Sequence, residues 1–235
     1  MVLGSVSTIE MIRHGSAVSE ARRDVLLDGI ARIMASNWHF TQRHWSREDS
    51  PFHDEYGLVF ASQHAEMVGY SIYKRVALDG TPALYRAGAA VAASHQREGF
   101  YRRMSQALLT TEWSAKPDGE EMYLAWRTRN PLIWAANARW CTAVVPAIVE
   151  GPVDAKLQEA CLRLARQLYP DCSIEPPAMI MREVYAHLTY LREPYDQVAS
   201  PISAWYAAVV PHPGDAVFSV GTVQRRAAEA LRPEA

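Results

Sequence analysis

The sequence has few cysteines and no long hydrophobic run. Its three cysteines, Cys141, Cys161 and Cys172, are an odd number at spacings that fit no disulfide framework or zinc motif, so reduced thiols are expected. No apolar stretch approaches the roughly 18–20 residues of a membrane helix. Residues 1–15 lack the basic and apolar segments of a signal peptide. We therefore expect a cytoplasmic protein with no membrane partner.

An excess of one charge is also lacking. The 235 residues include 24 basic and 26 acidic side chains, which gives a formal net charge of −2. Binding to nucleic acid needs a basic surplus that neutralises phosphates, so no nucleic-acid partner is expected. The spacings of His39, His44, His53 and His64 fit no metal-binding pattern, and we expect no metal site.

The hydrophobic pattern that is present predicts an α+β fold. The turn signal Asp79-Gly80 follows two strand-like runs and precedes a third, which indicates an antiparallel meander. Helices and strands then alternate, so we expect a mixed, mostly antiparallel sheet flanked by helices. Strands are predicted at residues 8–12, 56–62, 67–76, 83–93, 122–126 and 142–149, a terminal β-hairpin at 203–210 and 216–223, and helices at 21–36, 99–114, 130–140, 153–169 and 178–191.

The most informative segment is residues 91–103, VAASHQREGFYRR, where a predicted strand gives way to a predicted helix. Amides at a helix start are unpaired and the helix dipole is positive there, so such a junction can bind a diphosphate. Gly99 would let a ligand approach the backbone closely. A plain strand-to-helix turn without a ligand is the alternative explanation of the same pattern.

The segment resembles the acyl-CoA-binding signature of the GNAT acyltransferase superfamily, which is a strand, a Gln/Arg-x-x-Gly-x-Gly/Ala loop and a helix. Gln96 and Gly99 match the first two positions of that loop, whereas Tyr101 stands where the family has a small residue. The predicted order of elements over residues 25–149 also agrees with the family. The resemblance does not cover the last third of the chain.

The resemblance implies an N-acyltransferase that moves an acyl group from acyl-CoA, most simply acetyl-CoA, to an amine by direct attack. Residues 1–150 would form the acyl-CoA-binding domain, with residues 151–235 as an extension of helices and a strand pair packed on it. Asn130 would begin the helix after the family's fifth strand. We expect it mainly to cap this helix, and a contact with the cofactor is a second expectation. By the same resemblance, the donor diphosphate is expected at Gln96, Arg97, Glu98, Gly99, Phe100, Tyr101 and Arg102, and the pantetheine beside Val91 and Ala93.

Catalysis by such an enzyme requires an uncharged amine, so a group or a water must remove its proton. Glu66, Tyr85 and His95 are the candidates. Asn137 stands where many GNAT enzymes keep a tyrosine that protonates the leaving thiolate, so the usual general acid is not identified. A small-molecule amine is the expected acceptor, and amino acids and protein amines stay open. An acidic acyl carrier protein as donor and a homodimer are further expectations.

Two other functions stay open. Arg13-His14-Gly15 is similar to the Arg-His-Gly motif of the histidine phosphatases, in which His14 would attack a phosphoryl group and His95 would be its partner. A GNAT-like binding module without catalysis is the second alternative, and the missing tyrosine at position 137 is consistent with it.

Overall fold

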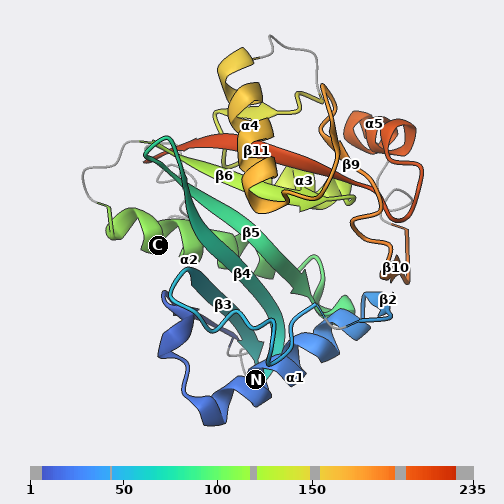
Figure 1. Cartoon of the computed structure of the whole chain (residues 1–235). Coiled ribbons are helices and arrows are strands. Elements are labelled where there is room, and N and C mark those ends of the chain that lie inside the picture. Colours follow the sequence, from blue (N-terminus) through green and yellow to red (C-terminus); the bar gives the residue numbers. More distant parts are fainter. Residues whose placement is uncertain (1–6, 43, 117–120, 149–153, 194–199, 226–235) are drawn as a thin grey trace. The chain divides into compact units, whose positions relative to one another are not determined.

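The computed structural model describes residues 7–42, 44–116, 121–148, 154–193 and 200–225 (Figure 1). They form an α+β fold with a mixed, mostly antiparallel sheet and flanking helices, as the sequence predicts. The chain divides into two compact units. Unit 1 takes in the described parts of residues 1–38, 42–75 and 86–118, and unit 2 takes in those of residues 39–41, 76–85 and 119–235.

Unit 1 is built from antiparallel strands and two long helices. In the register of its strands, Ile9 lies opposite Ala61 and Phe60 lies opposite Tyr70. The second helix packs on the first two strands. The elements are β1 (Ser7–Ile12), the 3-10 turn η1 (Gly15–Ala17), α1 (Glu20–Ala35), β3 (Tyr56–Gln63), most of β4 (Glu66–Leu78), the end of β5 (Thr81–Val91), the 3-10 turn η2 (Ala93–His95) and α2 (Phe100–Ser114).

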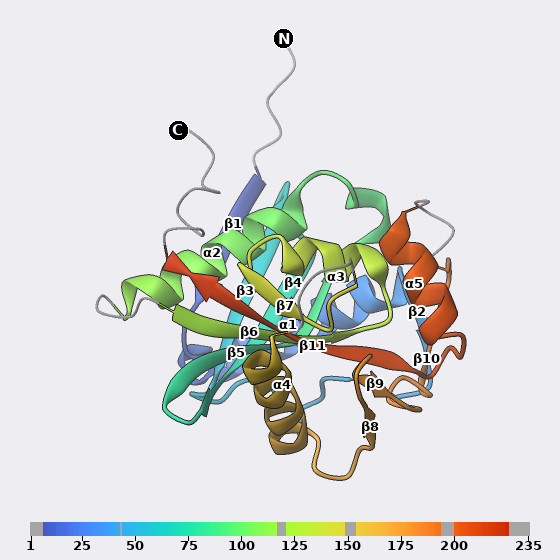
Figure 2. The same cartoon turned by 90° about the horizontal axis from the view of Figure 1, so that it is seen from above.

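Unit 2 is organised around its last strand, β11 (Ala216–Gln224), which pairs antiparallel with β6, β7 and β9. Helix α4 packs on this strand (Figure 2). The other elements are β2 (Trp38–Phe40, which extends into the unit from Trp38), β6 (Glu121–Thr128), α3 (Pro131–Ala138), β7 (Ala143–Val145), α4 (Ala155–Leu168), β8 (Ile174–Glu175), β9 (Ile180–Met181), β10 (Leu188–Tyr190) and α5 (Pro201–Val209). The unit holds residues on both sides of position 150, where the sequence places a domain boundary.

The predicted helix at residues 178–191 is wrong. This segment contains β9 and β10, joined by turns. Met179 and Glu183 have φ angles of 55° and 58°, in the left-handed region that a right-handed helix excludes. Pairing of Ile180 and Met181 with β11 and β8 buries these apolar side chains instead.

The predicted strand at residues 203–210 is also wrong, and with it the terminal β-hairpin. Residues 201–209 form α5, with Pro201 at its first position and the Ser200 hydroxyl accepting a hydrogen bond from the Ser203 amide at 3.1 Å. Ser203, Tyr206 and Val210 are buried at helical spacing. Strand β11, which follows α5, pairs with β6, β7 and β9 and not with residues 203–210.

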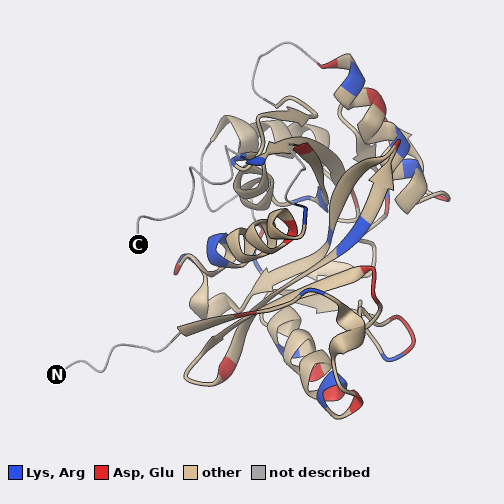
Figure 3. Cartoon of the chain, turned by 90° about the vertical axis from the view of Figure 1, so that its left-hand side faces the viewer, with Lys and Arg blue, Asp and Glu red and all other residues tan. Residues whose placement is uncertain are grey.

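Charged residues are sparse on the strands, where most of the ribbon in Figure 3 is tan. Arg86 of β5 and Arg127 of β6 are among the exceptions, and each lies inside a strand that is otherwise mostly apolar. Charged side chains are rarely buried without a reason, so the surroundings of these two arginines are informative about function.

Among the described residues no helix is both long enough and apolar enough to cross a membrane.

Candidate functional site

The loop between β5 and α2 contains two residues in the left-handed conformation. Arg97 has a φ of 70° and Gly99, which directly precedes α2, has a φ of 79°. Glycine adopts this conformation without the penalty that a Cβ brings. No described atom lies within 4 Å of the position that a Cβ on Gly99 would take. The space in front of the helix start is therefore open at Gly99.

The amide groups of the first turn of α2 lie before the hydrogen-bond ladder of the helix. The Arg103 amide donates to the Gly99 carbonyl at 3.0 Å, so the amides of Phe100, Tyr101 and Arg102 precede the first hydrogen bond of the helix. Gly99 supplies no side-chain cap, and the first turn carries no acidic residue. These donors, at the positive end of the helix dipole, fit a phosphate group.

Side chains that follow α1 are bonded to the last residues of β5 and the turn after it. The Asn37 side-chain amide donates to the Val91 carbonyl at 3.0 Å, and its oxygen accepts from Gln96 at 2.6 Å. The Ser36 hydroxyl accepts from the Ala93 amide at 3.1 Å. The Val91 carbonyl and the Ala93 amide, beside which the sequence predicts the pantetheine, therefore have hydrogen-bond partners within unit 1.

Tyr101, the departure from the family's small residue, packs on a buried arginine. The Arg86 guanidinium carbon lies 5.0 Å from the centroid of the Tyr101 ring. The same guanidinium donates to the hydroxyls of Ser71 at 2.8 Å and Ser105 at 3.1 Å. A buried positive charge thus lies against the first turn of α2, where it adds to the field of the helix dipole.

Described contacts do not bring the three catalytic candidates together. Glu66, the first residue of β4, is exposed and lies 3.6 Å from Arg32. His95 ends η2, and its Nδ1 lies 2.8 Å from the Ser94 hydroxyl. Tyr85 belongs to unit 2. The roles of these three residues stay predictions.

Tyr85 lies in an aromatic cluster of unit 2. Its hydroxyl is hydrogen-bonded to that of Tyr169, and its ring stacks on Phe218 at 6.2 Å. Burial raises the pKa of Tyr85 well above the usual value, so the hydroxyl stays protonated at neutral pH. A hydroxyl that keeps its proton cannot take one from an amine, so this environment does not suit Tyr85 as a base. Arg127 belongs to the same cluster. It is not among the site residues predicted from the sequence, although an arginine inside an apolar strand is a signal of a functional or buried polar site.

Asn130 has the capping role that the sequence predicts. Its side-chain oxygen accepts from the Leu132 amide at 2.9 Å, and Pro131 occupies the first position of α3. Asn137, which stands in place of the family's tyrosine, is fully buried in the same helix. A buried amide has no proton to give at neutral pH, so Asn137 does not replace the missing general acid.

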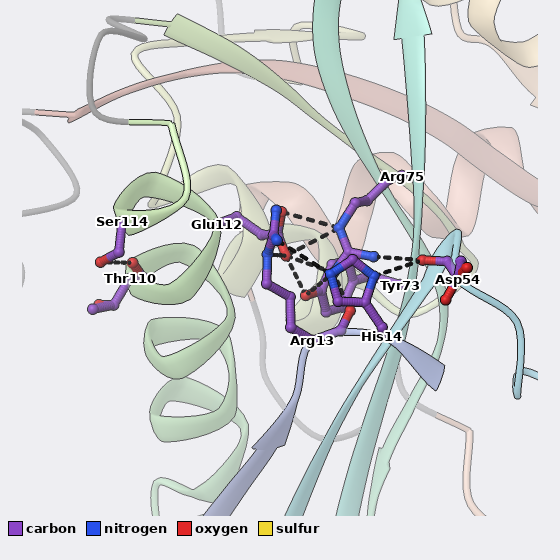
Figure 4. Close-up of polar contacts among 8 residues, drawn as sticks. All are labelled: Arg13, His14, Asp54, Tyr73, Arg75, Thr110, Glu112 and Ser114. Atoms are coloured by element: carbon purple, nitrogen blue, oxygen red, sulfur yellow. Dashed lines mark hydrogen bonds and ion pairs between the residues drawn. The ribbon is translucent and has the colours of Figure 1, made fainter. Parts of the chain in front are cut away.

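A second polar cluster in unit 1 surrounds Glu112 of α2 (Figure 4). Its buried carboxylate accepts from the Tyr73 hydroxyl at 2.6 Å and from Arg75 Nη2 at 2.7 Å. Arg13 Nε lies 3.6 Å away. Burial opposes ionisation, but the hydrogen bonds from Arg75 and Tyr73 outweigh it, and the pKa of Glu112 falls below its usual value.

His14 lies at the edge of this cluster. Its Nε2 is 3.2 Å from Arg13, and its Nδ1 is 3.3 Å from the Asp54 carbonyl (Figure 4). None of the described contacts joins His14 to His95, the partner that the phosphatase alternative requires. Arg13 faces Glu112, a carboxylate that would repel a phosphoryl group. The geometry therefore gives the phosphatase alternative no support.

Among the described residues, no group of three His, Cys, Asp or Glu could hold a metal ion.

Solved structures with a similar fold include N-acetyltransferases and an N-acyltransferase. The ribosomal-protein-S18-alanine N-acetyltransferase of Escherichia coli aligns over 93% of this chain and 95% of its own, with 15% identity and a TM-score of 0.44. The acyl-CoA N-acyltransferase of Pseudomonas aeruginosa aligns over 63% of this chain and 93% of its own, with 12% identity and a TM-score of 0.42. An aminoglycoside N-acetyltransferase in complex with CoA aligns over 49% of this chain and 75% of its own, with 12% identity and a TM-score of 0.37.

No family model matches the sequence, and no curated protein matches it. A further structure with a similar fold is described as a putative acetyltransferase of the GNAT family from Desulfovibrio desulfuricans, and it aligns over 93% of this chain and 99% of its own, with 12% identity and a TM-score of 0.38.

Proposed function

We propose that this chain is an N-acyltransferase that moves an acyl group from a CoA thioester to an amine. The junction of β5 and α2 supports the proposal. Gly99 leaves open space in front of the helix, and the next three amides precede its first hydrogen bond. A diphosphate placed there would accept from these amides and be stabilised by the helix dipole.

In the proposed reaction, the amine nitrogen bonds to the acyl carbon as the bond from that carbon to sulfur breaks. The amine gives up a proton, and the leaving thiolate takes one. Holding the two reactants in contact would supply about 7–11 kcal/mol of the rate acceleration. The pantetheine amides would replace Asn37 and Ser36 as partners of Val91 and Ala93.

Coenzyme A binding tests the diphosphate site directly. Acetyl-CoA at a hundred times its Kd should raise the free energy of unfolding by about 2.7 kcal/mol, and pantetheine, which lacks the diphosphate, should do much less. Thiol release with a panel of primary amines then distinguishes an enzyme from a binding module. If neither acetyl-CoA nor CoA raises the melting temperature of the protein, the proposal is refuted.

A matched pair of glycine variants separates loss of the site from backbone strain. Gly80 has a φ of 82° and, like Gly99, no described atom within 4 Å of its Cβ position. Gly99→Val and Gly80→Val should therefore bring a similar penalty, on the order of 1 kcal/mol. Only Gly99→Val should weaken acetyl-CoA binding, by at least tenfold. Equal affinity in the two variants would contradict a diphosphate site at Gly99.

A further inference from the structure

Arg127 of β6 lies among tyrosine side chains from other elements of unit 2. Its guanidinium carbon lies 4.6 Å from the ring centroid of Tyr169, which directly follows α4, and 4.7 Å from that of Tyr185, which lies between β9 and β10. The Tyr185 hydroxyl donates to the Arg127 carbonyl at 2.9 Å, which fixes this tyrosine beside the strand. Tyr85 of β5 completes the cluster through its hydroxyl contact with Tyr169.

The positive charge of Arg127 has no carboxylate partner among the described residues. Its Nε is buried without a hydrogen-bond partner. Arg129, two residues further along, has Glu193 at 3.4 Å, so an acidic partner is available to the neighbouring arginine and not to this one. A buried or half-buried charge without a counter-ion is costly, and arginines in such places are normally paired.

The groups that face Arg127 are neutral at pH 7. Burial raises the pKa of Tyr85 and of Tyr169, so both hydroxyls keep their protons. Burial and the charge of Arg127 lower the pKa of His187, so this imidazole is uncharged. The cluster therefore carries one positive charge with no anionic partner among the described residues, and, although burial opposes it, the surrounding tyrosines raise the pKa of Arg127 above its usual value.

The geometry of the cluster favours a planar anion. Two aromatic rings pack on the guanidinium, so a further ligand meets it through its N–H edge. A carboxylate fits that edge with two parallel hydrogen bonds, and hydroxyls such as that of Tyr169 can donate to the same group. Arg127 as a whole is half-buried rather than fully enclosed.

We propose that Arg127, with Tyr85, Tyr169 and Tyr185, binds the carboxylate of a small organic acid. If the N-acyltransferase function holds, amines that also carry a carboxylate, as amino acids do, are the first acceptors to test. This last step rests on the proposed function, whereas the carboxylate site itself does not.

Benzoate and benzamide, which have the same shape and differ in charge, are suitable probes. Ligand-observed NMR at millimolar concentration should show benzoate bound to the wild-type protein and benzamide bound at least tenfold more weakly. Arg127→Gln should abolish benzoate binding, and Arg127→Lys, which keeps the charge and loses the planar fork, should weaken it. Arg163→Gln, on the exposed arginine of α4 that pairs with Asp79, should leave it unchanged.

The comparison of benzoate with benzamide needs only the wild-type protein, so the test stands even if an Arg127 variant does not fold. Equal binding of the two probes, no binding of benzoate, or benzoate binding that survives Arg127→Gln would each overturn the carboxylate site. Thiol release from acetyl-CoA is measured separately. Equal turnover of amino acids and their amides would refute the acceptor class while the acyltransferase function stands. Benzoate binding without any thermal response to CoA would refute the acyltransferase function while the carboxylate site stands.

Discussion

Replacing Glu112 by glutamine removes a buried carboxylate on which the hydroxyl of Tyr73 and the guanidinium of Arg75 converge, at 2.6 and 2.7 Å. Removing one member of a buried ion pair costs about 3–5 kcal/mol, because the partner is left as an uncompensated charge. Glutamine keeps one oxygen that can accept from Tyr73, so we place Glu112→Gln near the lower bound, at about 3 kcal/mol. That is a large fraction of the 5–15 kcal/mol that stabilises a typical protein.

Urea unfolding followed by tryptophan fluorescence and by circular dichroism measures this loss. With a slope of about 2 kcal/mol per molar urea, the midpoint should fall by about 1.5 M. Glu10→Gln is the matched control, because the Glu10 carboxylate is also held by an arginine, Arg22, but both side chains are more than 40% exposed. An exposed pair contributes about 0–1 kcal/mol. Similar losses in the two variants would refute the argument from burial.

The pH dependence gives an independent check on the same residue. Because the folded-state pKa of Glu112 lies below the usual 4.5, its stabilisation is complete above that pH and is lost as the pH falls through the lowered value. The difference in stability between wild type and Glu112→Gln should therefore be full at pH 7 and shrink below about pH 4.5. A difference that grows on acidification would contradict the lowered pKa.

Three further predictions concern other parts of the molecule. Asn37→Ala should change acetyl-CoA affinity several-fold if pantetheine takes its place at Val91, and an unchanged Kd in calorimetry would contradict that position. Asn130→Ala should lower the free energy of unfolding in urea by about 1 kcal/mol, because α3 loses its cap, and no loss would contradict the capping role. Burial raises the pKa of Cys161 from 9.0 to about 12, so its alkylation in the native protein should be roughly a thousandfold slower than that of an unperturbed thiol, and mass spectrometry of iodoacetamide-treated protein would reveal any faster reaction.

Local signals in the sequence predicted the first part of the fold well. The apolar spacing of residues 21–36 predicted α1, and the turn at Asp79-Gly80 predicted the β4–β5 hairpin. Asn130-Pro131 predicted the start of α3. In each case the information lies within a few neighbouring residues, because caps and tight turns are determined by local chemistry.

The errors arise where distant residues decide the structure. Residues 203–210 are rich in apolar and aromatic side chains, which suggested a strand, although Ser200-Pro201 was a usable helix-start signal. The strands of residues 178–191 are very short, and pairing with β11 and β8 accounts for β9. The Arg127 cluster draws on β5, β6, α4 and the segment between β9 and β10, so the local pattern could single out the arginine in its apolar strand but not the tyrosines around it.

The position of β11 has a consequence for biosynthesis. It is the last described strand in chain order, yet β6 and β9 both hydrogen-bond to it. Until β11 has been synthesised, the backbone groups of β6 on that side lack their β11 partners and can pair with the backbone of another chain. Prematurely released polypeptides should therefore aggregate, and a synthetic peptide of residues 216–224 supplied in trans is a natural candidate for rescuing them by strand complementation.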